Sequence, residues 1–308
     1  RVGLVGYGEV GKILAEDLRG RGIAVHAYDV KLDARPDGPE GSAGNAMRAH
    51  ACEHGVDLVP AHADLAARAD LIVSAVTANQ TVPVAWACAP GIRPAAFFLD
   101  LNSSSPGAKT RAAALVEAAG GRYVEGAVMT AVPPYRIGVP LLLGGPHATT
   151  ADAPLGQLGF AGTAYDEELG VASATKMCRS VMVKGLEALV VESLTAARAY
   201  GVEDRVVESL YETFPGVDWE KQAAYVFQRV IEHGRRRSEE AREVAETLCE
   251  IGLTPWLTEA TAARQGWVAD LADEGVFGVR GTGEFAQSPD WRTEADRILA
   301  RVRLVPKE

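Results

Sequence analysis

Several features that define special classes of protein are missing from this chain of 308 residues. It has only four cysteines and no Cys-x-x-Cys pair, which argues against a disulfide scaffold or a zinc ribbon. It has no apolar run of about 18 residues, so we expect no membrane span. Lys and Arg number 31 against 41 Asp and Glu, and this net charge of −10 argues against a nucleic-acid partner.

The remaining composition is that of an ordinary globular protein, with 47% hydrophobic and 23% charged residues. The length predicts about two domains. The scattered cysteines are expected to be free thiols in a reducing compartment. The first apolar run begins almost at Arg1, and no secretory leader is visible, so we expect a cytoplasmic protein.

The first half alternates short apolar runs with amphipathic stretches. This alternation predicts an α/β fold, a Rossmann-type doubly wound parallel sheet, over residues 1–166. Strands are expected at 2–5, 23–28, 56–59, 71–76, 96–99, 123–128 and 140–143, and helices at 9–19, 42–54 and 106–119.

From residue 167 the pattern changes, because glycines become rarer and helical periods become longer. We expect an all-helical domain over residues 167–308. Its helices are predicted at 172–200, 217–233, 238–251 and 258–273, followed by a glycine-rich loop at 275–283.

The segment from Gly6 to Gly11 fits the pattern G-x-G-x-x-G between a predicted strand and a predicted helix. The first glycine permits the tight turn, the second lets the backbone approach a pyrophosphate, and the third lets helix and strand pack closely. The start of the helix offers free N–H groups to phosphate. We therefore assign the phosphates of a dinucleotide to Gly6, Tyr7, Gly8, Glu9, Val10 and Gly11.

Asp29 lies 18 residues after Gly11, at the end of the second predicted strand. A carboxylate there hydrogen-bonds the adenosine ribose and repels a 2′-phosphate, which favours NAD over NADP. Lys31 lies two residues further and weakens that preference. Val76 and Thr77, at the end of another predicted strand, are also assigned to the cofactor site.

Four segments of the chain together resemble the β-hydroxyacid dehydrogenase family, which includes 3-hydroxyisobutyrate and 6-phosphogluconate dehydrogenases. They are the opening stretch 3–11, the polar motif Asp100-Leu101-Asn102-Ser103-Ser104-Ser105-Pro106, the segment 125–138, and the segment 170–176. Residues 173–180 and 213–216 are similar to a less-studied branch with its own helical C-terminal domain. The resemblance implies hydride transfer between nicotinamide and the hydroxyl carbon of a small β-hydroxy acid.

By this resemblance Lys176 is the general acid/base. A lysine can serve as a base near neutral pH when burial and a neighbouring positive charge lower its pKa. The family usually has asparagine four residues after the lysine, and this chain has Ser180, which lies on the same face of the helix. We therefore assign Lys176 and Ser180 to catalysis.

The resemblance also places Asn102 near the nicotinamide and Ser103 near the substrate, although both residues could instead cap the helix that begins at Pro106. The family's substrate loop carries Ser-Gly-Gly, whereas this chain has Met-Thr-Ala at 129–131. Thr130 is assigned to the substrate from this loop. Arg136 is a candidate clamp for a carboxylate or phosphate, with a surface arginine as the alternative.

His233 and Arg235 belong to the basic segment 233–237. In 6-phosphogluconate dehydrogenases, basic residues of the partner subunit reach the substrate, which suggests the same role here in a homodimer formed through the helical domain. The alternative is a solvated helix face, balanced by nearby glutamates.

No metal is expected. His50 and His54 have the i, i+4 spacing of a metal pair, but no third ligand is evident at a useful spacing, so we interpret this segment as a surface helix.

Two other functions remain open. Imine reductases share the fold, but they usually place Asp or Tyr where Lys176 stands. A dinucleotide-binding sensor without catalysis would fit the altered substrate loop.

Overall fold

A computed structural model describes residues 1–33, 39–280, 282–283, 285–286 and 288–303. The chain divides into two compact units, Arg1–Met177 and Cys178–Glu308, which are considered separately. The expected domain boundary at residue 166 falls at the end of a strand, whereas the contacts within the chain divide it eleven residues later, inside a helix.

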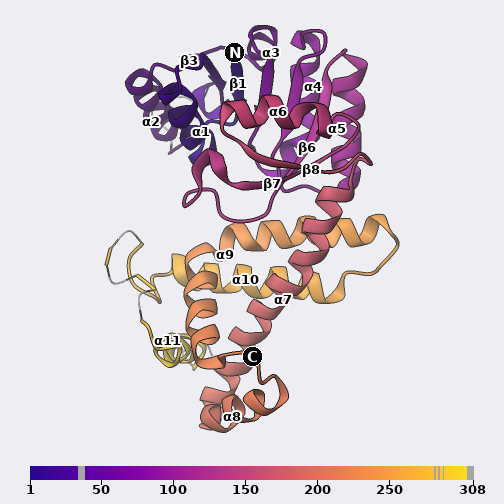
Figure 1. Ribbon diagram of the computed structural model, residues 1–308. Helices are drawn as coiled ribbons and strands as arrows, with labels where there is room; N and C mark the ends of the chain where they lie inside the picture. The colour runs from indigo at the N-terminus through magenta and orange to yellow at the C-terminus, as the bar shows by residue number, and fades with distance from the viewer. Residues whose placement is uncertain (34–38, 281, 284, 287, 304–308) are drawn as a thin grey trace. The chain divides into compact units, whose positions relative to one another are not determined.

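The first unit is built on an eight-stranded sheet with the order β3-β2-β1-β4-β5-β6-β7-β8 (Figure 1). The first six of these strands are parallel to one another. The strands are β1 Val2–Val5, β2 Val25–Tyr28, β3 Asp57–Leu58, β4 Leu71–Ser74, β5 Phe97–Asp100, β6 Arg122–Val128, β7 Pro140–Gly144 and β8 Ala161–Asp166. The predicted α/β fold with a Rossmann-type sheet is confirmed.

The prediction that all strands run parallel was wrong at one end of the sheet, where β7 and β8 run opposite to the other six strands. β7 runs antiparallel to β6, with Glu125 opposite Gly144, and β8 then pairs parallel to β7. Only residues 129–139 connect β6 to β7. A parallel return needs a crossover of a dozen or more residues, so this connection is too short for one.

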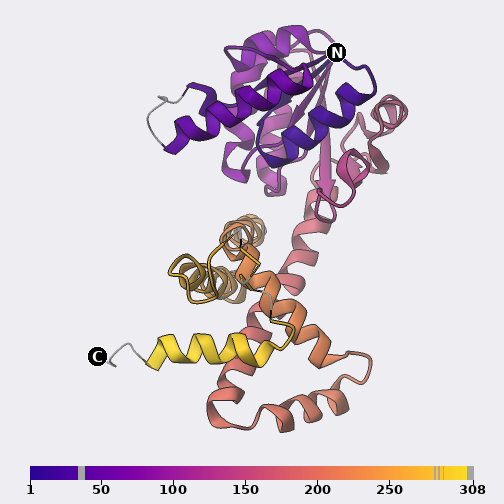
Figure 2. The ribbon, with the colours of Figure 1, turned by 90° about the vertical axis from the view of Figure 1, so that its left-hand side faces the viewer.

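Six α-helices cover the two faces of this sheet (Figures 1 and 2). Residues of α1, α2 and α6 share one apolar core with the sheet, and residues of α3, α4 and α5 share the other. The bounds are α1 Glu9–Gly20, α2 Pro39–His54, α3 His62–Arg68, α4 Thr81–Cys88, α5 Pro106–Ala118 and α6 Ala148–Leu158. Four elements, α3, α4, α6 and β8, were not predicted from the sequence, because they are short and their periodicity is weak.

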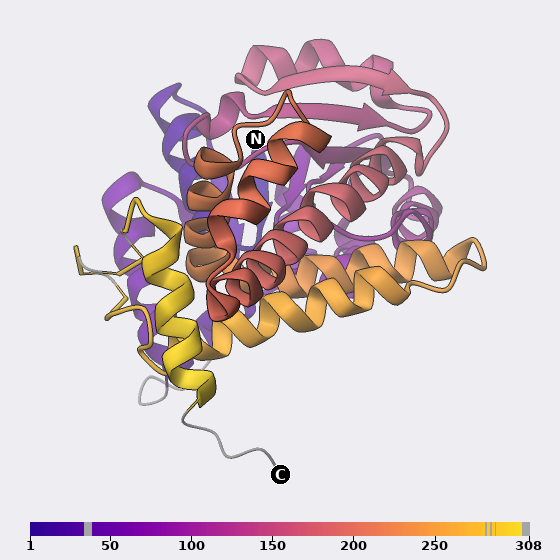
Figure 3. The same cartoon turned by 90° about the horizontal axis from the view of Figure 1, so that it is seen from below.

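The described part of the second unit consists of helices joined by turns and loops, without a strand. Its elements are the continuation of α7 (Val171–Tyr200), then α8 Glu203–Thr213, α9 Trp219–Glu250, α10 Trp256–Asp273 and α11 Trp291–Arg303. The predicted break of α9 into two helices was wrong. Gly234 lies inside α9, where a Cβ would come within 2.8 Å of the Gln265 carbonyl oxygen of α10. The glycine therefore permits close packing of α9 against α10, which run side by side in Figure 3.

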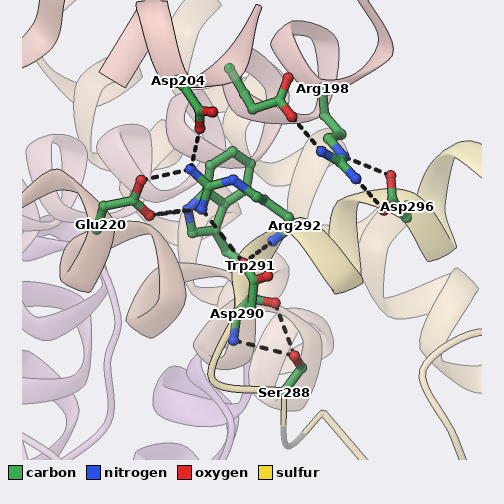
Figure 4. Close-up of polar contacts among 9 residues, drawn as sticks. Arg198, Asp204, Glu220, Ser288, Asp290, Trp291, Arg292 and Asp296 are labelled. Atoms are coloured by element: carbon green, nitrogen blue, oxygen red, sulfur yellow. Dashed lines mark hydrogen bonds and ion pairs between the residues drawn. The ribbon is translucent and has the colours of Figure 1, made fainter. Parts of the chain in front are cut away.

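Ion pairs tie α11 to its neighbours (Figure 4). Arg292 binds Glu220 of α9 and Asp204 of α8, with Nη–O distances of 2.7 and 2.6 Å. Arg198 of α7 binds Asp296 of α11 at 2.8 Å. Beneath these pairs, Trp291 is buried and packs against Phe227 of α9. Polar contacts at the surface thus orient a helix whose apolar face packs into the core.

All four cysteines are free thiols, as expected, and burial raises the pKa of Cys88 to about 12. Over the residues that the structure describes, no helix combines the length and the apolar character needed to cross a membrane.

Candidate active site

Most of the predicted site residues of the first unit lie at the carboxyl ends of β1, β4 and β5. The strand order reverses between β1 and β4, which is where α/β sheets open a crevice for ligands. Backbone hydrogen bonds continue past the strands, from Ala75 N to Val5 O at 2.8 Å and from Leu101 N to Ser74 O at 2.9 Å. The three loops that follow these strands are therefore held beside one another.

The glycine loop has the geometry that its pattern predicts. Gly6 has a φ of +89°, and a Cβ there would lie 2.4 Å from the Ala75 carbonyl oxygen. A Cβ on Gly11 would lie 2.1 Å from the Gly6 carbonyl oxygen, so this glycine is needed for packing. A Cβ on Gly8 would meet no described atom within 4 Å, and Gly8 is the N-cap of α1. An open backbone at a helix N-terminus fits the pyrophosphate of a dinucleotide.

Asp29 lies directly after β2, with its carboxylate turned to the glycine loop. Its oxygens accept hydrogen bonds from Tyr7 N at 2.9 Å and from Lys31 N at 3.0 Å. The carboxylate is half-buried, and the Lys31 residue is exposed. These two contacts fix the side chain that we expect to face the ribose, and they leave lone pairs for hydroxyl donors.

Asn102 joins the loops after β4 and β5. Its Oδ1 accepts a hydrogen bond from Val76 N at 2.7 Å, and its Nδ2 donates to Ser74 Oγ at 3.0 Å. Both ends of this buried amide therefore hold the loop that carries Val76 and Thr77. Ser105, rather than Asn102, caps α5, because Ser105 Oγ accepts a hydrogen bond from Ala108 N.

Lys176 and Ser103 meet although 73 residues separate them in the sequence. Lys176 Nζ donates a hydrogen bond of 2.6 Å to Ser103 Oγ. Ser103 follows β5, and Lys176 lies in the second turn of α7. Both side chains are half-buried. An amine beside a hydroxyl at the carboxyl edge of the sheet is a suitable arrangement for moving a proton.

Glu125 holds the beginning of α7, and the sequence analysis did not assign it a role. It is fully buried on β6 and accepts hydrogen bonds from Gly170 N, at 2.7 Å, and from Ser173 N. These are N–H groups at a helix start that lack partners within the helix. An acidic residue inside the apolar run 123–128 was the available signal. Glu125 thereby fixes the turn that precedes Lys176.

Asp100, which is also fully buried, holds the loop that follows β5. Asp100 accepts a hydrogen bond from Tyr123 Oη at 2.6 Å and forms an ion pair with Lys109 Nζ at 2.9 Å. Burial and the nearby Asp100 carboxylate raise the pKa of Tyr123 well above its usual value. Asp100 also accepts from Asn102 N at 2.9 Å. The site loop is thus anchored to the sheet by a fully paired polar cluster.

Arg136 forms its ion pairs with α1 rather than contacting Lys176 or Ser103. Its guanidinium binds Glu16 at 2.6 Å and Asp17 at 2.7 Å, both on α1. These carboxylates compete with any substrate anion for Arg136, and the predicted clamp remains untested. Thr130 is exposed beyond the end of β6, and its predicted substrate contact also stays a prediction.

The remaining predicted residues belong to the helical unit. Ser180 is buried one turn after Lys176 on α7. Arg235 is paired with Asp270 and Asp273 of α10. His233 is part-buried, and burial lowers its pKa. Their predicted contacts with substrate stay predictions.

The structure places a third candidate ligand beside His50 and His54, which their spacing in the sequence does not indicate. Glu16 of α1 lies beside them, and the ligand atoms of all three residues are within 4.8 Å of one another. The sequence did not reveal it because Glu16 lies 34 residues before His50.

The fold and glycine loop define a dinucleotide-binding domain, and comparison with known proteins identifies its family. Residues 1–154, half of the chain, match the NAD binding domain of 6-phosphogluconate dehydrogenase. Residues 197–268 match a domain of unknown function, DUF1932. The chain therefore belongs to the family that carries this NAD binding domain, and the resemblance inferred from its motifs is confirmed.

Solved structures extend the likeness over both units. A conserved hypothetical protein from Sinorhizobium meliloti is 36% identical, with a TM-score of 0.76 over 97% of this chain and 96% of its own. A conserved protein described as structurally similar to 3-hydroxyacid dehydrogenases is 29% identical, with a TM-score of 0.68 over 88% and 99%. The 3-hydroxyisobutyrate dehydrogenase of Mycobacterium tuberculosis shares the fold at 16% identity, with a TM-score of 0.70 over 96% and 98%.

Proposed function

We propose that this protein is an NAD(P)-dependent oxidoreductase that acts on the hydroxyl carbon of a small β-hydroxy acid or a related compound. The observation that carries the proposal is the hydrogen bond of 2.6 Å between Lys176 Nζ and Ser103 Oγ. It supports Lys176 as the proton carrier, because Ser103 follows β5 at the same edge of the sheet as the glycine loop. Membership of the family supports a nicotinamide dinucleotide as the cofactor. The position of Lys176 beside Ser103 supports proton transfer at a hydroxyl carbon.

In the oxidation direction, a neutral Lys176 amine takes the proton of the substrate hydroxyl. In the reduction direction, the Lys176 ammonium returns that proton to the forming alkoxide. Ser103 holds the amine through its hydroxyl, and Glu125 fixes the helix start that carries it. Ser180 is proposed to hydrogen-bond the substrate, as the family's asparagine does.

When bound, the nicotinamide dinucleotide supplies the hydride acceptor or donor. Gly6 to Gly11 and the α1 N-terminus would hold its pyrophosphate, and Asp29 would hold the adenosine ribose. We propose a preference for NAD, because the Asp29 carboxylate would repel a 2′-phosphate.

The test is a screen of purified protein with NAD and with NADP against hydroxy acids, β-hydroxy-amino acids, sugar acids and phosphorylated sugar acids. Lys176→Ala is expected to lower kcat by about 10²- to 10⁴-fold while binding of NADH, followed by fluorescence, persists. The exposed Lys221 of α9 offers a matched control, Lys221→Ala, with unchanged turnover. Equal turnover by wild type and Lys176→Ala would refute the assigned base.

The same assay distinguishes the other functions. Imines added to the panel and reduced by wild type, with no hydroxy acid oxidised, would identify an imine reductase. NADH binding without any turnover would favour a sensor. Absence of NADH binding would contradict the glycine-loop interpretation itself.

We also propose that the protein forms a homodimer through its helical unit. The turn between α9 and α10 exposes Ile251, Leu253, Trp256 and Leu257, whose exposed fractions are 76, 55, 77 and 80%. Such a contiguous apolar patch is typical of a protein interface. Sedimentation of wild type and of Trp256→Glu/Leu257→Glu should show a dimer that dissociates in the variant. A wild-type monomer would exclude it.

A further inference from the structure

The cluster of Glu16, His50 and His54 has no part in the proposed reaction. His50 and His54 lie one turn apart on α2, with ring centroids 4.4 Å apart. Glu16 faces them from α1, and its Oε1 is 3.0 Å from His50 Nε2. All three side chains are half-buried. Two imidazoles and one carboxylate on two packed helices form the ligand set of a three-residue zinc site.

From this arrangement we propose that Glu16, His50 and His54 bind one Zn²⁺ ion per chain, which joins α1 to α2. Zinc bonds to nitrogen and oxygen of about 2.0–2.1 Å place ligand atoms of a tetrahedral site about 3.3 Å apart. Glu16 Oε1 and His50 Nε2, at 3.0 Å, are slightly closer than this separation. Since the ligand atoms lie within 4.8 Å, His54 must move by no more than about 1.5 Å. Water completes the coordination.

Tyr7 supplies a second, independent indication. Its hydroxyl lies 2.9 Å from His50 Nδ1. The phenol oxygen can accept a hydrogen bond from that nitrogen. When an ion is bound, a hydrogen on Nδ1 donated to Tyr7 Oη would leave the Nε2 lone pair for the metal, in place of the contact with Glu16. Metal-binding histidines are held in this way by a partner on the other ring nitrogen.

Glu16 supplies the one carboxylate ligand of the proposed site. Asp17, beside it on α1, is paired with Arg136, and Arg19 donates a hydrogen bond to the backbone oxygen of His54. Arg136 binds Oε2 of Glu16, whereas the histidine faces Oε1, so the guanidinium and the zinc ion use different oxygens.

Calorimetric titration of the full chain, freed of any affinity tag and treated with chelator, tests the site with Zn²⁺. Wild type should bind one ion per chain, and binding should weaken at least about tenfold in His54→Gln and in Glu16→Gln. The melting temperature should rise with zinc in wild type and not in these variants. His54 is the decisive position, because among the described residues its imidazole makes a ring contact with His50 and no hydrogen bond, so its replacement removes little besides the proposed ligand.

Two controls separate this site from other donors. Cys52→Ser removes the exposed thiol of the same helix, and His147→Gln removes a histidine that lies 4.0 Å from Glu117. Both controls should bind zinc as wild type does. Wild type that binds no tighter than His54→Gln, or zinc binding that is lost with Cys52 and kept without His54, would overturn the proposal. His54→Asn is the second variant should His54→Gln alter the melting curve without zinc.

Discussion

The two units of this protein bury polar side chains for different purposes. In the first unit, Asp100 and Glu125 are buried at the carboxyl edge of the sheet, and their partners are loop and helix-start N–H groups. In the second unit, Glu187 of α7 is buried between helices and binds Arg237 and Arg229 of α9. The first set holds the loop after β5 and the start of α7, whereas the second set joins helices. Substitutions should separate these two roles.

The largest effect is expected at Glu187. Its replacement by alanine leaves Arg237, which is 3% exposed, as a buried charge without its carboxylate partner. We expect the free energy of unfolding to fall by about 3–5 kcal/mol, measured by urea denaturation. Glu192→Ala on the same helix removes an exposed partner of Arg264 and should cost less than about 1 kcal/mol. Equal losses in both variants would contradict the structural role.

Glu125→Gln should affect turnover more than cofactor binding. The amide of glutamine presents a donor toward one of the two N–H groups, so the start of α7 and the attached Lys176 shift. We expect kcat to fall by up to about 100-fold, with the Kd for NADH unchanged. Glu117→Gln, on the exposed face of α5, is the matched control. A parallel loss of NADH binding would show that Glu125 supports the domain as a whole.

Asp29→Ser should change cofactor choice with little change in stability. Removing the carboxylate removes its repulsion toward a 2′-phosphate, while serine can still hydrogen-bond the ribose. We expect the ratio of kcat/KM for NADP to that for NAD to rise by about tenfold, a change worth about 1.4 kcal/mol. An unchanged ratio would show that Asp29 serves only the backbone of Tyr7 and Lys31.

The smallest effect is expected in the surface network of α11. Hydrogen bonds from Arg292, and also from Trp291, lower the pKa of Glu220. A lowered acid pKa stabilises the folded state above the unfolded pKa, about 4.3, and this stabilisation is lost as the pH falls through the lower folded value. Since Glu220 is 44% exposed, Glu220→Gln should cost less than about 1 kcal/mol at pH 7.

Urea denaturation of wild type and Glu220→Gln at several pH values measures this effect. The difference between the two proteins should stay constant from pH 7 to about pH 5 and shrink below about pH 4. A difference that grows with acidity would contradict the assigned ion pair.

The sequence predicted local features well and long-range pairings poorly. The positive φ of Gly6 and the contact of Gly11 with the Gly6 carbonyl oxygen are local, so the motif was sufficient to predict them. The direction of β7 depends on the length of the connection before it. Hydrophobic periodicity does not measure this length, but the eleven residues after Val128 are too few for a parallel crossover.

The contact between Lys176 and Ser103 was implied only by family resemblance. The partners of Glu125 and Glu16 could not be predicted, because each lies 34 or more residues away on an element whose placement depends on the whole sheet.

Because Lys176 follows β8 in the sequence, it is synthesised after the loops that follow β1, β4 and β5. The loops that would hold a dinucleotide are complete once Ser105 has been added, whereas Lys176 emerges 71 residues later, after β6, β7 and β8. At about 5–20 residues per second, this interval lasts roughly 4–14 seconds. A nascent chain therefore has the loops that would bind a dinucleotide before it has the proposed proton carrier, so a dinucleotide could serve as a folding ligand before it serves as a reactant.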